Sequence, residues 1–321
     1  MFSVVIPVYN EETNLPALNQ ALEGVFEKLG QPYEIVYVDD GSRDQSFDVL
    51  KQLALQNPQV RAVRLRKNFG QSAAMRAGID TARGEIIITL DADLQNDPAD
   101  IPAMIEHMSR TQCDIVSGWR KDRKDHFLSR TFVSRIANGL ISEITKVRLH
   151  DYGCTLKIYR AEVIKSVNLY GELHRFLTAL ASWQGAKIEE VVVNHRPRHS
   201  GKSKYGLSRI YRVLFDLLAV KYFLTYNAKP LHFFGSIGFF IMLPGLLLAA
   251  WISLTRFLFH ADISPRIPTL IFCALSILAG FQMIMMGLLA DLIVRSSKEN
   301  AHENPTYRVR EMIGSEEPVR K

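Results

Sequence analysis

The sequence lacks the marks of several common protein classes. It has 3 cysteines, at positions 113, 154 and 273, an odd number without paired spacing, which argues against a disulfide framework. No signal-peptide pattern comes before the strand-like residues 2–7. Neither a GxGxxG fingerprint after the first predicted strand nor a Walker lysine loop is present, which argues against the common dinucleotide and P-loop sites. Because the sequence shows neither a disulfide framework nor a signal peptide, we expect the large N-terminal part to lie in a reducing cytoplasm.

Charge is missing from two long stretches, although the whole chain carries a net charge of +6. Residues 231–255 and 267–290 contain no Asp, Glu, Lys or Arg. At about 1.5 Å per residue, each stretch is long enough to cross a hydrocarbon core as a helix. A buried helical hairpin in a soluble protein is the alternative. We predict a transmembrane hairpin over residues 229–295, with crossings at about 231–255 and 267–291.

Basic residues flank the two crossings. Lys229 precedes the first crossing, and Arg295 and Lys298 follow the second, as the positive-inside rule expects of cytoplasmic flanks. Arg256 and Arg266 in the outer link weaken this pattern slightly. We predict that both the N-terminus and the C-terminus are cytoplasmic, with residues 296–321 as a surface tail in which residues 304–307 dock locally.

Strand-like and helix-like segments alternate before the hairpin. The apolar spacing predicts strands at 3–8, 34–39, 60–65 and 86–90, and helices at 12–29, 45–56 and 71–82. Further strands are predicted at 156–159 and 189–195, and a further helix at 172–185. Strands that alternate with helices build a doubly wound, mostly parallel sheet. The predicted fold class is therefore α/β, with residues 1–206 as one domain.

Two carboxylates end the fourth predicted strand, and a carboxamide follows them. Asp91, Asp93 and Gln95 sit at alternate positions, so their side chains can converge at the strand end. Hard oxygen ligands of this kind suit Mg²⁺ or Mn²⁺ bound together with substrate phosphates. A turn in which short acidic residues cap backbone amides is the alternative. We favour the metal site because ligands of open α/β sheets bind at the carboxyl ends of the strands.

Polar residues also follow the other predicted strands. They are Pro7, Tyr9 and Glu11 after the first strand, Asp39 and Asp40 after the second, and residues 66–70, including Asn68 and Gly70, after the third. Helix capping explains any one of these residues more easily than all of the strand ends together. The pattern favours a nucleotide whose phosphates are held by a metal ion, with carboxylates contacting the base and the ribose.

Cations gather in two further segments. Residues 120–148 are basic with apolar residues at helical intervals, so we predict a helix at about 127–147 at the membrane interface, with a solvated basic face as the alternative. Residues 195–206 form a glycine-containing loop that can close around phosphate. A nucleic-acid patch is the competing interpretation, but the adjacent hairpin argues against it, so no nucleic acid is expected as a partner. Residues 207–228 are predicted to form an amphipathic helix on the membrane surface.

These motifs resemble those of a known family. Residues 3–11 (SVVIPVYNE), 39–42 (DDGS), 68–71 (NFGQ) and 91–95 (DADLQ) are similar to those of family 2 glycosyltransferases of the GT-A fold, whose sheet is Rossmann-like. The hairpin and the 195–206 loop narrow the resemblance to polyisoprenyl-phosphate glycosyltransferases, such as dolichol-phosphate mannose synthases and bacterial enzymes that charge undecaprenyl phosphate. Residues 151–154 (DYGC) resemble a turn of the undecaprenyl-phosphate aminoarabinose transferases.

The resemblance implies a reaction and a location. It implies metal-dependent, inverting transfer of a hexose or pentose from a nucleotide-sugar, with uridine favoured over guanosine, to undecaprenyl or another polyisoprenyl phosphate. The reaction would take place at the cytoplasmic face of a bacterial inner membrane, and its product would serve cell-envelope, lipopolysaccharide or protein glycosylation. A homo-oligomer is also implied. The sugar itself stays open.

The resemblance also implies roles for individual residues. The nucleotide-sugar would contact Pro7, Tyr9, Glu11, Asp39, Asp40, Asn68, Gly70 and Asp91, and the metal ion would bind Asp91, Asp93 and Gln95. The acceptor phosphate, together with the donor phosphates, would be bound by Arg120, Arg130, Arg135, Arg198, Ser203 and Lys204. The implied catalytic residues are Asp91, Asp93, Arg198 and Lys204.

One position departs from the family pattern. Cys154 stands where some members carry an Asp that is proposed as a base, which weakens any base assignment here, including one to Asp151. A lipid phosphate, with a second pKa of about 6, is already ionised at neutral pH, so we expect that no base is needed.

Other functions fit the sequence less well. A processive polysaccharide synthase of the same fold would usually carry a QxxRW motif and more crossings, and this chain has neither. A catalytically inactive, membrane-tethered nucleotide-sugar-binding scaffold would have lost its metal ligands, yet Asp91, Asp93 and Gln95 are all present. A transporter is disfavoured because two crossings give little from which to build a path.

Overall fold

The structure is a computed structural model of the whole chain. It describes residues 1–121, 142, 147, 149–167, 177–183, 185–196, 230–259, 264–300 and 307–314, without the side chains of 183, 264 and 295–300. These residues fall into two compact units, one that combines Met1–Leu217 with Pro305–Lys321 and one that covers Leu218–Asn304. Apart from residues 142 and 147, the predicted helix at 127–147 lies outside the described residues, and so does the predicted helix at 207–228.

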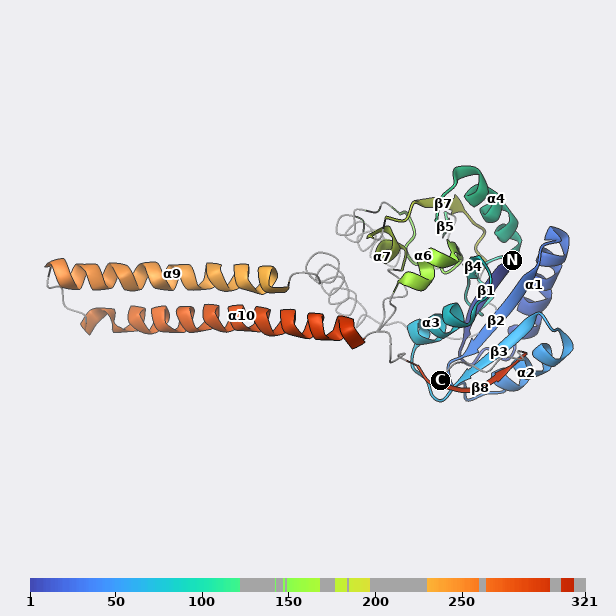
Figure 1. Cartoon of the computed structure of the whole chain (residues 1–321), viewed down its shortest axis with the longest axis horizontal. Coiled ribbons are helices and arrows are strands. Elements are labelled where there is room, and N and C mark those ends of the chain that lie inside the picture. The colour runs from blue at the N-terminus through green and yellow to red at the C-terminus, as the bar shows by residue number, and fades with distance from the viewer. Residues whose placement is uncertain are drawn as a thin grey trace. The chain divides into compact units, whose positions relative to one another are not determined.

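The first unit is built on an 8-stranded sheet with the order β7-β5-β6-β4-β1-β2-β3-β8 (Figure 1). The strands are β1 (Phe2–Val8), β2 (Tyr33–Asp39), β3 (Val60–Leu65), β4 (Ile86–Thr89), β5 (Ile115–Trp119), β6 (Lys157–Arg160), β7 (Ile188–Val192) and β8 (Val309–Ile313). β6 and β8 run antiparallel to their neighbours, and the other strands share one direction. The prediction of a mostly parallel sheet is confirmed.

Helices cover both faces of this sheet. One apolar cluster packs α1 (Leu15–Leu29), α2 (Ser46–Gln56) and α4 (Ile101–Thr111) against one face. A second cluster packs α3 (Gln71–Thr81), α6 (Ala161–Ser166) and α7 (Leu177–Trp183) against the other. The central strands β1 and β2 are apolar along nearly their whole length because neither of their faces meets water. The result is a doubly wound sheet.

The C-terminal tail differs from the prediction. Residues 296–300 continue the helix α10 (Ile267–Asn300), and β8 pairs antiparallel with β3 at the edge of the sheet, so residues 309–313 are a strand and not part of a surface extension. The physical reason is that β3 would otherwise expose a row of unpaired backbone groups. Tyr307 does dock, because its hydroxyl donates to Asp80 Oδ2 at 3.1 Å.

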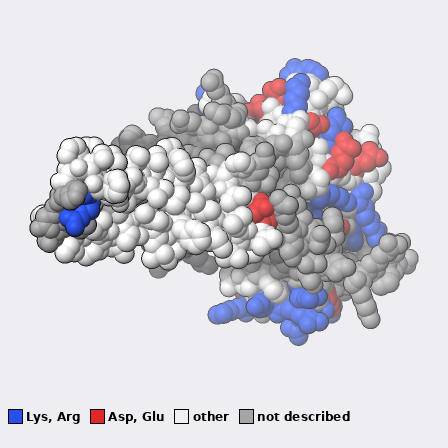
Figure 2. Space-filling model, turned by 60° about the vertical axis from the view of Figure 1, so that its left-hand side comes forward, with Lys and Arg blue, Asp and Glu red and all other residues white. Residues whose placement is uncertain are grey.

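The second unit contains two long apolar helices, α9 (Pro230–Phe259) and α10. Both are long and apolar enough to cross a membrane, and most of their side chains are exposed, as they would not be in a soluble core. Figure 2 shows a surface almost without charge along these helices. Glycines allow them to approach closely, because a Cβ built on Gly238 would lie 2.5 Å from the carbonyl oxygen of Gly280.

Candidate active site

The strand ends that carry the predicted site residues meet at one edge of the sheet. β1, β2, β3 and β4 are parallel neighbours, so the segments after Val8, Asp39, Leu65 and Thr89 all begin at this edge. The first two of these segments touch, because the Asp40 N–H donates to the Val8 carbonyl oxygen at 2.8 Å. This is the edge at which α/β sheets bind ligands.

Asp40 holds the segment after β3 in place. Its Oδ1 accepts a hydrogen bond from the Phe69 N–H at 2.7 Å, and its Oδ2 accepts one from the Gly70 N–H at 2.9 Å. Gly41, at φ +68°, lies so close to Lys67 that a Cβ would meet the carbonyl carbon of Lys67 at 2.6 Å. Burial raises the pKa of Asp40, and the two backbone hydrogen bonds act against this rise. The Asp40 carboxylate therefore shapes the site from within the protein.

Asp39 has one carboxylate oxygen without a hydrogen bond. Its Oδ1 accepts from the Ser42 N–H at 3.0 Å, whereas its Oδ2 is buried, has no hydrogen-bond partner among the described residues and lies 3.6 Å from Arg64 Nε. Burial raises the pKa of Asp39, opposed by the bonds to Ser42 and by the charge of Arg64. A buried acceptor without a hydrogen bond costs about 1–3 kcal/mol.

Asp91 and Asp93 follow β4 as a pair of close carboxylates. The pKa of Asp91 is raised to about 7, first because the carboxylate is withdrawn from water and second because of the negative charge of Asp93. Asp91 Oδ1 accepts a hydrogen bond from Gln71 Nε2 at 2.9 Å, and Asp93 Oδ1 accepts one from the Gln95 N–H at 3.2 Å. A carboxylate whose charge is opposed by burial and by a second carboxylate is suited to binding a cation.

The residues at this point fit a divalent metal ion. Within the described ranges, no group of three or more His, Cys, Asp or Glu side chains is arranged as a closed metal site. The donor set proposed from the sequence, Asp91 and Asp93 with the amide of Gln95, stays a prediction and is an open one. An open set of this kind leaves positions for water and phosphate oxygens, which Mg²⁺ and Mn²⁺ commonly keep.

Arg120 follows β5 and is bound to Asp151. Arg120 Nε donates to Asp151 Oδ2 at 2.7 Å, and Arg120 Nη2 donates to Oδ1 at 3.1 Å. The charge of Arg120 also lowers the pKa of Asp91, so the guanidinium lies within electrostatic range of the carboxylate pair. Since a guanidinium has five N–H donors, Arg120 has further donors besides the two that bind Asp151. Asp151 is a counter-ion here, which argues against its use as a base.

Cys154 is a buried packing residue. Its Sγ lies 3.7 Å from both Asn96 Oδ1 and the Leu156 carbonyl oxygen. A Cβ built on Gly118 would lie 2.9 Å from the same sulfur, so the neighbouring strand leaves no room beside it. Burial raises the pKa of the thiol to about 11, so it is protonated at neutral pH. Cys154 is therefore neither a thiolate nor a substitute for a carboxylate base.

Several predicted phosphate-binding residues lie outside the described ranges. They are Arg130, Arg135, Arg198, Ser203 and Lys204. Arg198, Ser203 and Lys204 belong to the 195–206 loop. Its described start is held in place because the Arg196 N–H donates to the Gln95 carbonyl oxygen at 2.9 Å and the Arg196 side chain pairs with Asp97. The 195–206 loop therefore begins beside the carboxylate pair.

The sequence interpretation gave no role to two residues of this region. Gln71 is the first residue of α3 and donates to Asp91; its signal was its place at the end of the NFGQ motif. Glu190 in β7 accepts hydrogen bonds from the backbone of His150 and Asp151. Nothing in the alternating residues of β7 marks Glu190, because its partners lie about 40 residues earlier in the chain.

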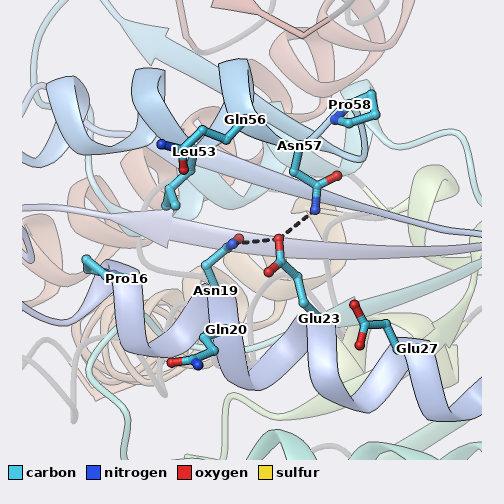
Figure 3. Close-up of a pocket in the computed structure, with 9 residues that line it drawn as sticks. All are labelled: Pro16, Asn19, Gln20, Glu23, Glu27, Leu53, Gln56, Asn57 and Pro58. Carbon is cyan, nitrogen blue, oxygen red and sulfur yellow. Dashed lines mark hydrogen bonds between the residues drawn. The ribbon is translucent and has the colours of Figure 1, made fainter.

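A hollow of about 430 Å³ lies elsewhere, between α1 and α2 (Figure 3). Glu23 Oε1 accepts hydrogen bonds there from Asn19 Nδ2 at 2.9 Å and from Asn57 Nδ2 at 2.5 Å. Asn57 precedes β3, so this hollow lies toward the sheet edge opposite to Asp39 and Asp91. Asn19, Glu23 and Asn57 bind one another there, and we assign the hollow no chemistry.

Comparison with known proteins places the chain among sugar transferases. Residues 3–167 match the family model for glycosyl transferase family 2. The chain is 43% identical over 314 residues to a dodecaprenyl-phosphate galacturonate synthase from Rhizobium johnstonii, an alignment that covers 97% of this chain and 92% of the relative. It is 36% identical over 319 residues to an undecaprenyl-phosphate 4-deoxy-4-formamido-L-arabinose transferase from Pseudomonas syringae pv. syringae, covering 99% and 92% of the two chains.

The solved structures add the fold. A glucosyl-3-phosphoglycerate synthase from Mycobacterium tuberculosis, in complex with Mn²⁺, UDP and glucosyl-3-phosphoglycerate, matches with a TM-score of 0.53 and 15% identity, over 70% of this chain and 79% of that chain. At this identity the likeness concerns the fold alone, and it confirms the GT-A-like arrangement. The family match and the full-length relatives together show that the chain is a glycosyltransferase and belongs to glycosyl transferase family 2.

Proposed function

We propose that the protein transfers a sugar from a UDP-sugar to a polyprenyl phosphate, with inversion at the anomeric carbon and with a divalent metal ion. The observation that carries this proposal is the carboxylate pair Asp91 and Asp93 at the end of β4, next to the strand ends that follow β1, β2 and β3. Similarity over nearly the full length to two polyprenyl-phosphate sugar transferases supports the acceptor class. The fold shared with a protein that binds UDP and Mn²⁺ agrees with the donor.

Each residue of the site would have its own role in the reaction. Asp39 would accept hydrogen bonds from the nucleoside, while Asp40 keeps the segment after β3 in place. Asp91, Asp93 and Gln95 would hold Mg²⁺ or Mn²⁺, which when bound neutralises the charge of the donor diphosphate. Arg120, oriented by Asp151, would bind a substrate phosphate.

No residue need act as a base in this reaction. The nucleophile would be an oxygen of the acceptor phosphate, which is ionised at neutral pH because its second pKa is about 6. That oxygen forms a bond to the anomeric carbon while the bond from this carbon to the UDP oxygen breaks, so the diphosphate leaves with the electron pair. The protein then has to align the two substrates and stabilise the leaving group. A protonated Cys154 and an ion-paired Asp151 agree with this mechanism.

The apolar hairpin supports a lipid acceptor. The exposed side chains of α9 and α10 are large and hydrophobic, as expected for contact with lipid tails. A polyprenyl tail would remain in the bilayer while its phosphate reaches the cytoplasmic site. We place the protein in the bacterial inner membrane with two crossings, with both termini in the cytoplasm, and with residues 1–206 as the catalytic domain. A homo-oligomer remains our expectation.

We infer that the donor sugar is a hexuronate. The galacturonate synthase shares 43% of residues with this chain, compared with 36% for the formamido-arabinose transferase, over similar shares of the chain. Purified full-length protein should be incubated with undecaprenyl phosphate, Mn²⁺ and, in turn, UDP-galacturonate, UDP-glucuronate, UDP-glucose and a UDP-formamidoarabinose. Product with a uronate alone supports the inference. Transfer of another sugar instead would reject the hexuronate and keep the reaction, while binding without transfer of any sugar would favour a scaffold.

A further inference from the structure

We propose that Glu190 is a positioning residue for sugar transfer: its carboxylate fixes the backbone at His150 and Asp151, so that Asp151 holds Arg120 against a substrate phosphate. This inference rests on the proposed function, because it takes Arg120 as a phosphate ligand. Glu190 lies in β7, opposite Ser117 of β5 in the sheet, and touches none of the predicted metal ligands in the described contacts.

The Glu190 carboxylate binds one turn of the chain, at His150 and Asp151. Its Oε1 accepts hydrogen bonds from the His150 N–H at 2.9 Å and from the Asp151 N–H at 3.3 Å. Its Oε2 lies 3.0 Å from the His150 backbone nitrogen and 2.8 Å from His150 Nδ1. Only 12% of the Glu190 side chain is exposed. Such charge-assisted hydrogen bonds to backbone amides are stronger than neutral ones, so this turn is held firmly.

The turn that carries His150 and Asp151 also orients Arg120. Asp151 Oδ1 accepts from Arg120 Nη2 and also from the Gly153 N–H at 3.1 Å, while Asp151 Oδ2 accepts from Arg120 Nε. Asp151 is almost fully buried, and 11% of the Arg120 side chain is exposed. The direction of the guanidinium is therefore set by where the Asp151 backbone lies. Glu190 fixes that backbone from β7, whereas Arg120 follows β5 and Asp151 lies before β6.

A ring stack supports the same alignment. The rings of Trp119 and His150 stack with centroids 4.1 Å apart and an interplanar angle of 17°. Trp119 precedes Arg120 and His150 precedes Asp151, so the ring stack and the ion pair join the same two segments at adjacent positions. Glu190 holds the His150 ring as well as its backbone, and so it supports both contacts.

The neighbouring Glu189 gives a matched control. It lies on the same strand, but 39% of its side chain is exposed and its carboxylate is 4.0 Å from His107 Nε2, away from the turn. Removing the charge of Glu189 therefore changes the net charge of β7 without loosening Arg120. If kcat/KM falls when Glu190 is replaced but not when Glu189 is replaced, the loss comes from the turn and not from the charge of β7.

The test is a double-mutant cycle on the full-length protein. Glu190→Gln, Asp151→Asn and the double variant are compared with the wild type for kcat and for KM of the UDP-sugar and the lipid phosphate. We expect Glu190→Gln to lower kcat/KM about tenfold or more, since small misplacements of a positioned group are costly. Adding it to Asp151→Asn should cost little more, because residues that act in one chain are not additive. Glu190→Asp should restore part of the activity, and Glu189→Gln should stay within about twofold of the wild type.

The proposal would be overturned if the fold-losses in kcat/KM of the two single variants multiply in the double variant. It would also be overturned if kcat/KM is unchanged in Glu190→Gln. Calorimetric binding of UDP with Mn²⁺ to the same four proteins gives a second readout. A wild type that binds UDP without transferring a sugar would reject the proposed function, while the cycle on UDP affinity would still test Glu190 through Arg120. If Glu190→Gln does not fold, the comparison of Glu190→Asp with Glu189→Asp replaces it, and equal effects of these two substitutions would overturn the proposal.

Discussion

Arg120 and Asp151 form a two-point ion pair, with Arg120 Nε 2.7 Å from Asp151 Oδ2 and Arg120 Nη2 3.1 Å from Asp151 Oδ1. The pair joins the end of β5 to the turn that leads to Cys154. It makes Asp151, three residues before Cys154, a counter-ion, and Arg120 has further guanidinium donors besides the two that bind Asp151. This arrangement agrees with the proposed binding of a substrate phosphate by Arg120 and argues against Asp151 as a base.

Replacing Asp151 should damage catalysis more than folding. In Asp151→Asn the side chain keeps one acceptor but loses its charge, so Arg120 is held less firmly. Since a hydrogen bond to a charged group contributes about 1.5–3 kcal/mol, we expect kcat/KM to fall about tenfold to a hundredfold. Steady-state kinetics measure this loss. Asp114→Asn is the control, because the Asp114 and Arg160 pair is more exposed and lies at 3.5 Å; an equal loss there would contradict a special role for Asp151.

Cys154 should be dispensable for the chemistry. Cys154→Ser keeps a small side chain next to Gly118, and its hydroxyl can donate to Asn96, so transfer should stay within a few-fold of the wild type. Burying a hydroxyl in place of a thiol should cost about 1 kcal/mol of stability. Activity and melting temperature are measured together. Complete loss of activity in a folded Cys154→Ser protein would show that the sulfur has a chemical role.

Asp91 should make the metal-free protein less stable at high pH. Its pKa is raised from 3.8 to about 7, so the folded protein binds this proton more tightly than the unfolded chain does. The carboxylate therefore costs stability above pH 7, and the cost falls as the pH decreases from about 7 to 3.8. Without metal, Asp91→Asn should be more stable than the wild type by about 1–3 kcal/mol at pH 8, and the gain should shrink at pH 5.

Thermal unfolding in EDTA at both pH values measures this difference. Asp48→Asn, on the exposed surface of α2, is the control and should show no such pH-dependent gain. Addition of Mn²⁺ and UDP should reverse the order of stability at pH 8, because the wild type alone has both carboxylates for the cation. A wild type that remains less stable than Asp91→Asn after this addition would argue against the metal site.

The hairpin should not tolerate a side chain at its closest approach. A Cβ on Gly280 would lie 2.5 Å from the Gly238 carbonyl oxygen and 2.6 Å from Met242 Cβ. Gly280→Ala should therefore separate α9 from α10 and destabilise the hairpin by about 1–3 kcal/mol. Gly235→Ala is the control, since its nearest contact would be an ordinary 3.8 Å. Size-exclusion chromatography after graded heating in detergent compares the two, and equal survival would contradict this packing.

Much of the fold follows from local sequence pattern. Leu15, Leu18, Leu22 and Phe26 recur at helical spacing, and in the structure they are the buried face of α1. The strands β1 to β4 end within one residue of their predicted positions because apolar runs stop where polar residues begin. The converging acids at the ends of these strands were predictable for the same reason, since parallel strands end at one edge.

Contacts between distant segments were not predictable in this way. Residues 309–313 carry two charged side chains among five and follow a long apolar helix, so nothing local marks them as a strand. Their structure depends on the open edge of β3, which only the assembled sheet defines. Two other contacts likewise depend on loops that meet only in three dimensions. They are the hydrogen bonds that Asp40 accepts from Phe69 and Gly70, and the ion pair of Asp151 with Arg120.

The most direct measurement is transfer by purified wild type and Asp93→Asn proteins from a UDP-sugar to undecaprenyl phosphate, followed by mass spectrometry of the lipid. The wild type should form a glycolipid with a single phosphate, and only when Mn²⁺ or Mg²⁺ is present. Asp93→Asn should lose at least about a hundredfold in rate while retaining its melting temperature, because one of two metal carboxylates is gone. Asp48→Asn, on the exposed surface of α2, should retain transfer. Undiminished transfer by Asp93→Asn, or a wild-type product that carries two phosphates, would contradict the account.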